Sequence, residues 1–183
     1  MIQNTESSYG WLAKLFHWLI ALAIFALIFV GFTMSSMESS PDKFELYKMH
    51  KASGVVVLIL VLLRLIWKYT NKTVEPPADL PSILKLAAKS GHFMLYVFMF
   101  LMPISGIMMS RFSGFDVSVF NLFIIPAAEK NTQVAGIFHQ IHAIGIWFFI
   151  VVIVLHIGAA LYHHFIRKDN VLMRMITSPN KYK

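Results

Sequence analysis

Four long stretches of apolar residues alternate with shorter polar connectors along the chain. They run from about residue 11 to 34, 50 to 67, 91 to 110 and 137 to 165. A helix needs about 20 residues to cross the hydrocarbon core of a bilayer. In lipid the backbone must satisfy its own hydrogen bonds, as a helix does. The pattern predicts one membrane domain over residues 1–183, folded as an all-α bundle of four transmembrane helices.

The first apolar stretch differs from a cleaved signal peptide. A signal peptide carries an apolar region of about 7–15 residues followed by a site of small residues. Here the apolar run is longer, and no small-x-small site follows it. We therefore expect the first helix to be retained.

Two connectors have distinctive compositions. The second contains Pro76, Pro77 and Pro81, so it should begin as extended chain, because proline disfavours helix. The third contains an apolar run, residues 117–126, that is too short to span a bilayer. We expect this run to lie in the membrane interface or to cap the outer end of the bundle.

Composition agrees with a membrane protein. Of the 183 residues, 57% are hydrophobic and 14% charged, and the mean hydropathy is +0.66. The chain has no cysteine, which excludes disulfides, iron–sulfur clusters, thiolate metal sites and covalent c-type haem. The net charge of +7 lies in connectors and tails, so it indicates membrane topology and not a nucleic-acid partner.

The connectors differ in charge. Residues 35–49 carry a net charge of −1 and residues 111–136 a net charge of zero, whereas residues 68–90 carry +2 and residues 166–183 carry +4. Cytoplasmic loops are enriched in Lys and Arg. We therefore predict that both termini and the second connector are cytoplasmic, and that the first and third connectors face the opposite, outer side.

Histidines within the apolar stretches are the main candidates for function, because ionisable groups in a membrane are costly. His142 and His156 are 14 residues apart. In a helix this is about 21 Å of rise and nearly four turns, so both project from one face at opposite depths. Two imidazoles so placed cannot share one metal ion, but they can serve two haems stacked across the membrane.

The same spacing of 14 residues recurs on the other three stretches. With the predicted topology, the inner level contains His17, Arg64, His92 and His156, and the outer level contains Gly31, His50, Gly106 and His142. Glycine at a ligand level would let a flat macrocycle approach the backbone. Bundle cores commonly hold cofactors between facing helices.

The two levels predict two ligand pairs. His50 pairs with His142 at the outer level, and His156 pairs with His17 at the inner level. His92 is the reserve ligand, and it is interpreted first as a contact to a haem propionate or to quinone. Three further histidines lie outside these levels: His139 is interpreted as an interface residue, and His163 and His164 as solvent-facing residues or propionate contacts.

Three cations near the ligand levels have two interpretations each. Arg64 either extends to the cytoplasmic surface as a topology marker or points inward to neutralise a propionate of the inner haem. Lys48 and Lys51 flank His50. They either anchor the helix end or raise the local potential and attract small anions from the outer side.

Taken together, these motifs resemble the bacterial cytochrome b561 family, and more distantly the cytochrome b subunits of hydrogenases and formate dehydrogenases. The resemblance covers nearly the whole chain and rests on order and spacing. The matching segments are F-H-W-L at 16–19, M-H-K-A-S-G at 49–54, L-L-R at 62–64, G-H-F-M-L-Y at 91–96, P-I-S-G at 103–106 and H-x-x-x-A-L-x-H-H-x-x-x-K-D-N at 156–170.

The resemblance implies a four-helix protein of the bacterial inner membrane that binds two haem b groups and exchanges electrons with quinone. The family's ligand pattern falls on His17, His50, His142 and His156. It also makes His92 a candidate quinone contact. The extra histidine, His139, departs from the pattern and competes with His142 as the ligand.

Some members of this family oxidise superoxide at the outer face and reduce ubiquinone. The resemblance therefore raises the hypothesis of a superoxide:quinone oxidoreductase, with a small outer donor or a redox protein as partner besides quinone and membrane lipid. One alternative is a haem-bearing anchor subunit of a dehydrogenase or hydrogenase. A histidine-based metal or proton transporter is the alternative of another class, but the four stretches contain no Asp or Glu, which such pathways usually need.

Overall fold

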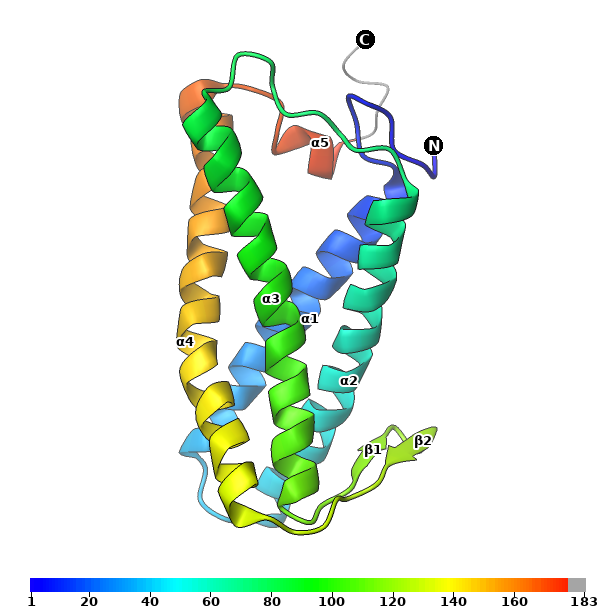
Figure 1. Ribbon diagram of the computed structural model, residues 1–183, viewed down its shortest axis with the longest axis vertical. Coiled ribbons are helices and arrows are strands. Elements are labelled where there is room, and N and C mark those ends of the chain that lie inside the picture. The colour runs from blue at the N-terminus through cyan, green and yellow to red at the C-terminus, as the bar shows by residue number, and fades with distance from the viewer. Residues whose placement is uncertain (178–183) are drawn as a thin grey trace.

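The fold is a bundle of four long helices (Figure 1). The computed structural model describes residues 1–177. The helices are α1 (Trp11–Ser36), α2 (Pro41–Thr70), α3 (Ser82–Phe112) and α4 (Thr132–Tyr162). Each is long and apolar enough to cross a membrane, which confirms the predicted all-α fold with four transmembrane helices.

Helices α2 and α3 begin earlier than the apolar pattern predicted. They start at Pro41 and Ser82, and not at about residues 50 and 91. At α2 the Ser40 side chain accepts a hydrogen bond from the Lys43 backbone N–H, and Pro41 occupies the first helical turn. These are strong helix-start signals, so the helix continues beyond its apolar part into the polar connector.

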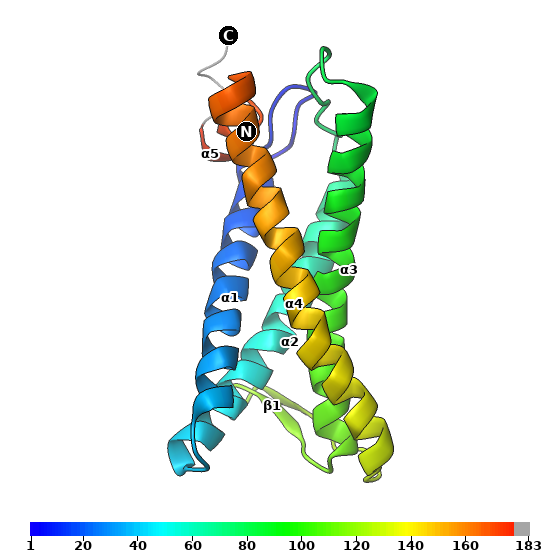
Figure 2. The same ribbon diagram turned by 90° about the vertical axis from the view of Figure 1, so that its left-hand side faces the viewer.

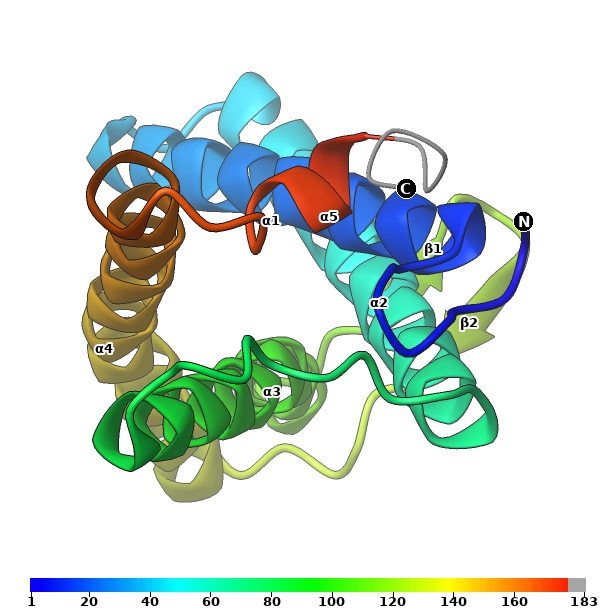
Figure 3. The same ribbon diagram turned by 90° about the horizontal axis from the view of Figure 1, so that it is seen from above.

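The four helices do not all pack on one another. Close packing joins α3 with α4, α1 with α2, and α2 with α3, whereas α4 forms no close pair with α1 or α2. Helices α3 and α4 lie near each other where α3 ends and α4 begins, and they diverge toward the end of the bundle that holds the N-terminus (Figures 2 and 3). The middle of the bundle is filled by one apolar cluster: Ile20, Val57, Val61, Phe98, Met99, Met102 and Phe149.

The third connector forms a β-hairpin of β1 (Val117–Val119) and β2 (Phe123–Ile125). The side chains of Val117 and Val119 are fully buried in a small cluster with Val55 of α2. The apolar run that was predicted to lie in the interface or to cap the bundle is thus a hairpin packed against α2.

After α4 the chain continues as a short π-helix, η1 (His163–Arg167), and then folds back through α5 (Met173–Ile176). This return places the described C-terminal residues at the same end of the bundle as the N-terminus (Figure 1). The indole of Trp18 donates to the Met175 carbonyl at 3.0 Å, and the Lys14 ammonium donates to the Thr177 carbonyl. These two hydrogen bonds attach residues 168–177 to α1.

A mostly buried carboxylate, Asp169, organises this return. It accepts hydrogen bonds from His163 Nδ1 at 2.5 Å, from the Val171 backbone N–H at 3.1 Å and from Arg167 Nε at 3.3 Å. Arg167 also donates to Asp79 of the second connector at 2.7 Å. Burial acts to raise the pKa of Asp169, but these hydrogen bonds and the His163 charge outweigh it and lower the pKa overall.

Replacing Asp169 with Asn should loosen residues 168–177 by about 1–3 kcal/mol, the usual cost of breaking hydrogen bonds to a buried charged group. Because the folded-state pKa is lowered, the ionised carboxylate stabilises the parent protein above the ordinary Asp pKa of about 3.9. That contribution is lost as the pH falls through the lowered value. Hydrogen exchange of residues 168–177, corrected for intrinsic rates, measures both effects. Glu129→Gln, at the other end of the bundle, is the control, and unchanged exchange in Asp169→Asn would contradict the assignment.

Candidate functional site

The outer site is an opposed pair of imidazoles. His50 of α2 and His142 of α4 have ring centroids 6.3 Å apart and ring planes inclined by 76°. Their helices are not a closely packed pair. The two side chains therefore meet across a space that the backbones leave between them.

His142 is oriented by its second ring nitrogen. Nδ1 lies 2.9 Å from the Met102 carbonyl oxygen and 3.1 Å from the Ser105 hydroxyl. A carbonyl oxygen only accepts, so Nδ1 carries the proton and Nε2 keeps a free lone pair. This is the usual arrangement of a metal-binding histidine, whose other N–H donates to a backbone carbonyl.

Two glycines lie against the outer pair. A Cβ atom on Gly106 would be 3.3 Å from Cε1 of His142, and one on Gly31 would be 3.5 Å from Cε1 of His50. Glycine was predicted at this level to admit a macrocycle. The atoms nearest to these two positions belong to the imidazoles themselves, so the glycines leave room for the histidine rings.

The geometry of the outer pair fits a metal held between two histidines. Because imidazole nitrogens bind a metal such as zinc at about 2.0–2.1 Å, two opposed ligands place their ring centroids roughly 6 Å apart. The measured separation of 6.3 Å agrees. In addition, Nδ1 of His50 is buried and has no hydrogen-bond partner within the described part of the chain. A polar atom buried in this way is costly, which suits a site completed by a group other than protein.

The inner site gathers three histidines from three helices. His156 of α4 lies 6.2 Å, between ring centroids, from His17 of α1 and 5.5 Å from His92 of α3. Among residues 1–177 no three His, Asp or Glu side chains are arranged to hold a metal ion by themselves. The inner site therefore offers pairs centred on His156, and both the proposed partner and the reserve lie within reach.

Arg64 points into the bundle at the inner level. Its Nη2 lies 3.1 Å from Nδ1 of His17, and its guanidinium lies 5.9 Å from the Tyr96 ring centroid. Arginine can only donate, so Nδ1 of His17 accepts here and the proton is on Nε2. Binding of a metal by Nε2 would move that proton to Nδ1, and Arg64 would then have to turn to another acceptor.

The two lysines beside His50 have different surroundings. Lys48 is exposed and forms an ion pair of 2.6 Å with Glu45. Lys51 is partly buried and donates to the Ser110 hydroxyl at 3.2 Å and to the Asp116 carbonyl at 3.3 Å. An opposite charge compensates Lys48, so Lys51 is the better candidate for an anion contact near the outer pair.

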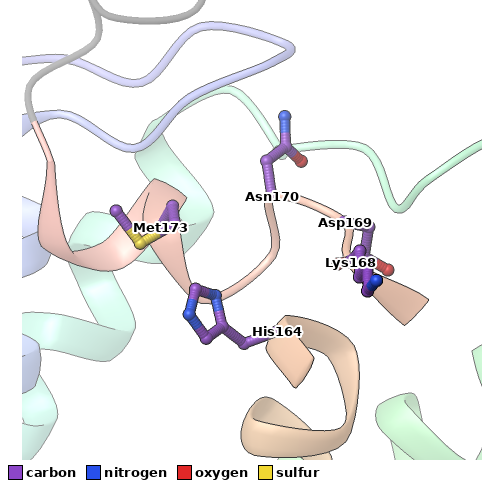
Figure 4. Close-up of a pocket in the computed structure, with 5 residues that line it drawn as sticks. All are labelled: His164, Lys168, Asp169, Asn170 and Met173. Atoms are coloured by element: carbon purple, nitrogen blue, oxygen red, sulfur yellow. The ribbon is translucent and has the colours of Figure 1, made fainter. Parts of the chain in front are cut away.

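The remaining histidines lie outside both levels. His139 is exposed on α4, so the geometry favours its neighbour His142 as the outer partner of His50. His163 is bound to Asp169. His164 lines a shallow cavity of about 330 Å³ at the inner end together with Lys168, Asp169, Asn170 and Met173 (Figure 4).

Sequence reasoning missed two supporting residues. Ser105, which is almost fully buried and contacts His142, lies in the quoted P-I-S-G segment but received no role. Tyr96, whose ring also lies 4.9 Å from the Lys68 ammonium, lies in the G-H-F-M-L-Y segment. Ser105 lies next to Gly106, and Tyr96 lies one helical turn after His92. These positions were the signal in the sequence that could have identified the two residues.

The chain is similar to known proteins along most of its length. The family model described as prokaryotic cytochrome b561 matches residues 8–178. "Cytochrome b561 homolog 2" of Escherichia coli K12 is 33% identical over 94% of this chain and 93% of its own length. "Cytochrome b561 homolog 1" of the same organism is 32% identical over 87% and 92%. "Probable superoxide oxidase CybB" of Yersinia pestis is 28% identical over 87% and 90%.

The contact of Gly106 with His142 predicts a specific loss. Gly106→Val should displace the imidazole, because even a single Cβ would lie 3.3 Å from it, and should break its hydrogen bond to Met102. We expect a haem held between His50 and His142, as the ligand pairs predict, to be mostly lost, while the absorbance of a haem predicted at the inner level is kept; haem content and the reduced spectrum measure this. Gly54→Val on α2 is the control, because nothing lies within 4 Å of its Cβ position. Equal haem loss in both variants would contradict the prediction.

Proposed function

The chain belongs to the prokaryotic cytochrome b561 family, and from this premise we propose that it carries electrons between two haem b groups and membrane quinone. Membership itself makes it an electron-transfer protein of a bacterial membrane with haem b as the implied cofactor. We further propose the inner membrane as its location, with both termini in the cytoplasm, as the distribution of Lys and Arg predicts.

The outer pair supports this proposal best. His50 and His142 face each other at 6.3 Å between ring centroids, and His142 is held in the protonation state that iron ligation needs. Two histidine ligands leave no open position on iron, which favours electron transfer over oxygen binding or activation. When bound, haem b supplies a one-electron iron couple.

The polypeptide positions the ligands and excludes water. The Met102 carbonyl fixes the His142 ring, and the apolar cluster at mid-bundle separates the outer from the inner histidines. Phe149 of this cluster is seven residues from both His142 and His156 and stacks on Phe98 at 5.7 Å. An electron that moves between the two histidine levels would cross this buried apolar cluster.

At the inner level we propose His156 and His17 as the ligands, with His92 as a contact to quinone or propionate. Arg64 then neutralises a propionate. This role follows from the proton shift on His17, which would convert Nδ1 from acceptor to donor and release the guanidinium. A carboxylate is a strong bidentate acceptor for arginine.

The ligand pairs predict which haem each variant loses. His50→Ala and His142→Ala should lose mainly the outer haem, and His156→Ala and His17→Ala mainly the inner one. The parent should contain about two non-covalent haems per chain with a low-spin bis-histidine spectrum. Haem content and redox titration of each purified variant measure this.

His139→Ala is the matched control on α4 and should keep both haems. If His17→Ala keeps both and His92→Ala loses one, then His92 is the inner ligand. A folded parent that stays colourless although haem was supplied during expression would overturn the proposal.

Superoxide is a second proposal, for the identity of the outer donor. The Yersinia pestis relative is named a probable superoxide oxidase, and in this chain Lys51 is held beside His50 by Ser110 and by the Asp116 carbonyl. A fixed positive charge next to the outer pair would attract a small anion. A haem-bearing anchor for a dehydrogenase or hydrogenase has the same electron-transfer chemistry and is the alternative if superoxide is not a donor.

Charge changes near His50 should alter the rate of haem reduction by superoxide. Lys51→Gln should slow it several-fold, because electrostatic steering acts on the association rate. Glu45→Gln, which leaves Lys48 uncompensated, should speed it. Added salt should slow the parent, since screening acts over roughly 8–10 Å.

Stopped-flow reduction with a superoxide source measures these rates, and haem content should stay unchanged in both variants. If neither added salt nor either substitution changed the rate, Lys51 would have no role in attracting superoxide. A complete lack of reduction would exclude superoxide and favour a protein partner.

A further inference from the structure

The β-hairpin between α3 and α4 has one buried face and an exposed apolar rim, which is formed by Phe120, Leu122 and Ile124. While Val117 and Val119 are at most 1% exposed, Leu122 is 82% exposed and Ile124 60%. Residues 117–128 contain no charged side chain. Exposed strands in soluble proteins are usually protected by charges, so this hairpin is not built for water.

The tip of the hairpin is conformationally strained. The Val119 carbonyl accepts from the Leu122 N–H at 2.9 Å, and both central residues of this turn have positive φ: 50° at Phe120 and 60° at Asn121. Such turns favour Asn and Gly at these positions. A bulky aromatic residue at positive φ is unusual and indicates that the Phe120 side chain, which is 53% exposed, has a use outside the polypeptide.

The position of the hairpin suggests what that use is. Figures 1 and 3 place the hairpin outside the bundle, beside α2. Its buried face also packs on Ile107 of α3, five residues before the last residue of that helix. Five residues of helix rise are about 7.5 Å. If the end of α3 lies at the membrane surface, the hairpin lies within the depth of about 5–10 Å at which apolar groups enter the boundary between headgroups and acyl chains.

The polar groups at the base of the hairpin agree with this depth. Arg111 Nε donates to the Pro126 carbonyl at 2.8 Å, and the Asp116 carboxylate accepts from the Ala127 N–H at 2.6 Å. Charged groups thus stand at the root, and apolar groups occupy the rim. On α2, against which the hairpin packs, Ile59 and Leu62 are also exposed apolar side chains.

We propose that the hairpin is an interfacial anchor, whose rim residues Phe120, Leu122 and Ile124 insert into the headgroup boundary of the outer leaflet. The two free strand edges are tolerated there, because water and headgroups satisfy backbone groups that hydrocarbon cannot. The anchor fixes the third connector, and with it the Asp116 carbonyl that holds Lys51, at a set height beside the outer histidines.

Site-directed spin labels test this proposal directly. The chain has no cysteine, so Leu122→Cys, Ile124→Cys and the control Glu129→Cys each give a single label. The full-length haem-loaded protein is placed in vesicles of phosphatidylcholine and phosphatidylglycerol. Collision of the label with oxygen, which concentrates in lipid, is compared with collision with a water-soluble nickel chelate.

We expect the labels at 122 and 124 to favour oxygen and the label at 129 to favour the chelate. Adding Phe120→Gly, which suits the positive φ and removes the aromatic ring, should raise chelate access at 124. A label at 122 as accessible to the chelate as that at 129 would overturn the proposal, as would shielding from both reagents with label–label broadening, which would indicate a second copy of the chain. An unchanged label at 124 in the Phe120→Gly background would remove Phe120 from the anchor.

Discussion

The constraint on which the structure depends is the separation of α4 from α1 and α2. Among the long helices, α4 packs closely only on α3, yet its residues His142 and His156 lie 6.3 and 6.2 Å, between ring centroids, from His50 of α2 and His17 of α1. Side-chain pairs therefore bridge spaces that helix packing leaves open. Helices α1 and α4 are neighbours around the bundle (Figure 3), and ridges and grooves would otherwise bring them into direct contact. The histidine pairs and the spacing of the helices therefore depend on each other.

Much of this could be predicted from the sequence because lipid imposes strict rules. The length of the apolar stretches predicted the four helices, and the spacing between His142 and His156 predicted two levels of histidines. Helix starts at Ser40 and Asn131 lay outside the apolar runs and depend on local capping, which hydropathy does not report. The hairpin was missed because an apolar run of its length is compatible with several structures. The Lys48–Glu45 ion pair also needed coordinates, since charges close in sequence can be paired or separate.

The two levels differ in how well the protein prepares them. At the outer level the Met102 carbonyl fixes the proton of His142 on Nδ1, so no rearrangement of that hydrogen bond is needed for ligation. At the inner level Arg64 donates to His17, and ligation through Nε2 requires that contact to break. A cation that must leave one acceptor needs another, and none of the Asp or Glu residues lies in the apolar part of the bundle. In the proposed function a propionate of the bound haem would meet this need.

The same difference gives the two levels different electrostatic surroundings. The inner level has Arg64 within reach and Lys68 over the Tyr96 ring, with no acidic residue in the apolar segments to offset them. Positive charge near a redox centre stabilises its reduced form, because reduction adds a negative charge. Between the levels lie the buried, stacked rings of Phe98 and Phe149, and charges beside such an apolar layer are screened less than charges at the surface. In the proposed function the outer level also has a cation, Lys51, held by Ser110 and the Asp116 carbonyl, so positive charge would favour the reduced state of a haem bound at either level.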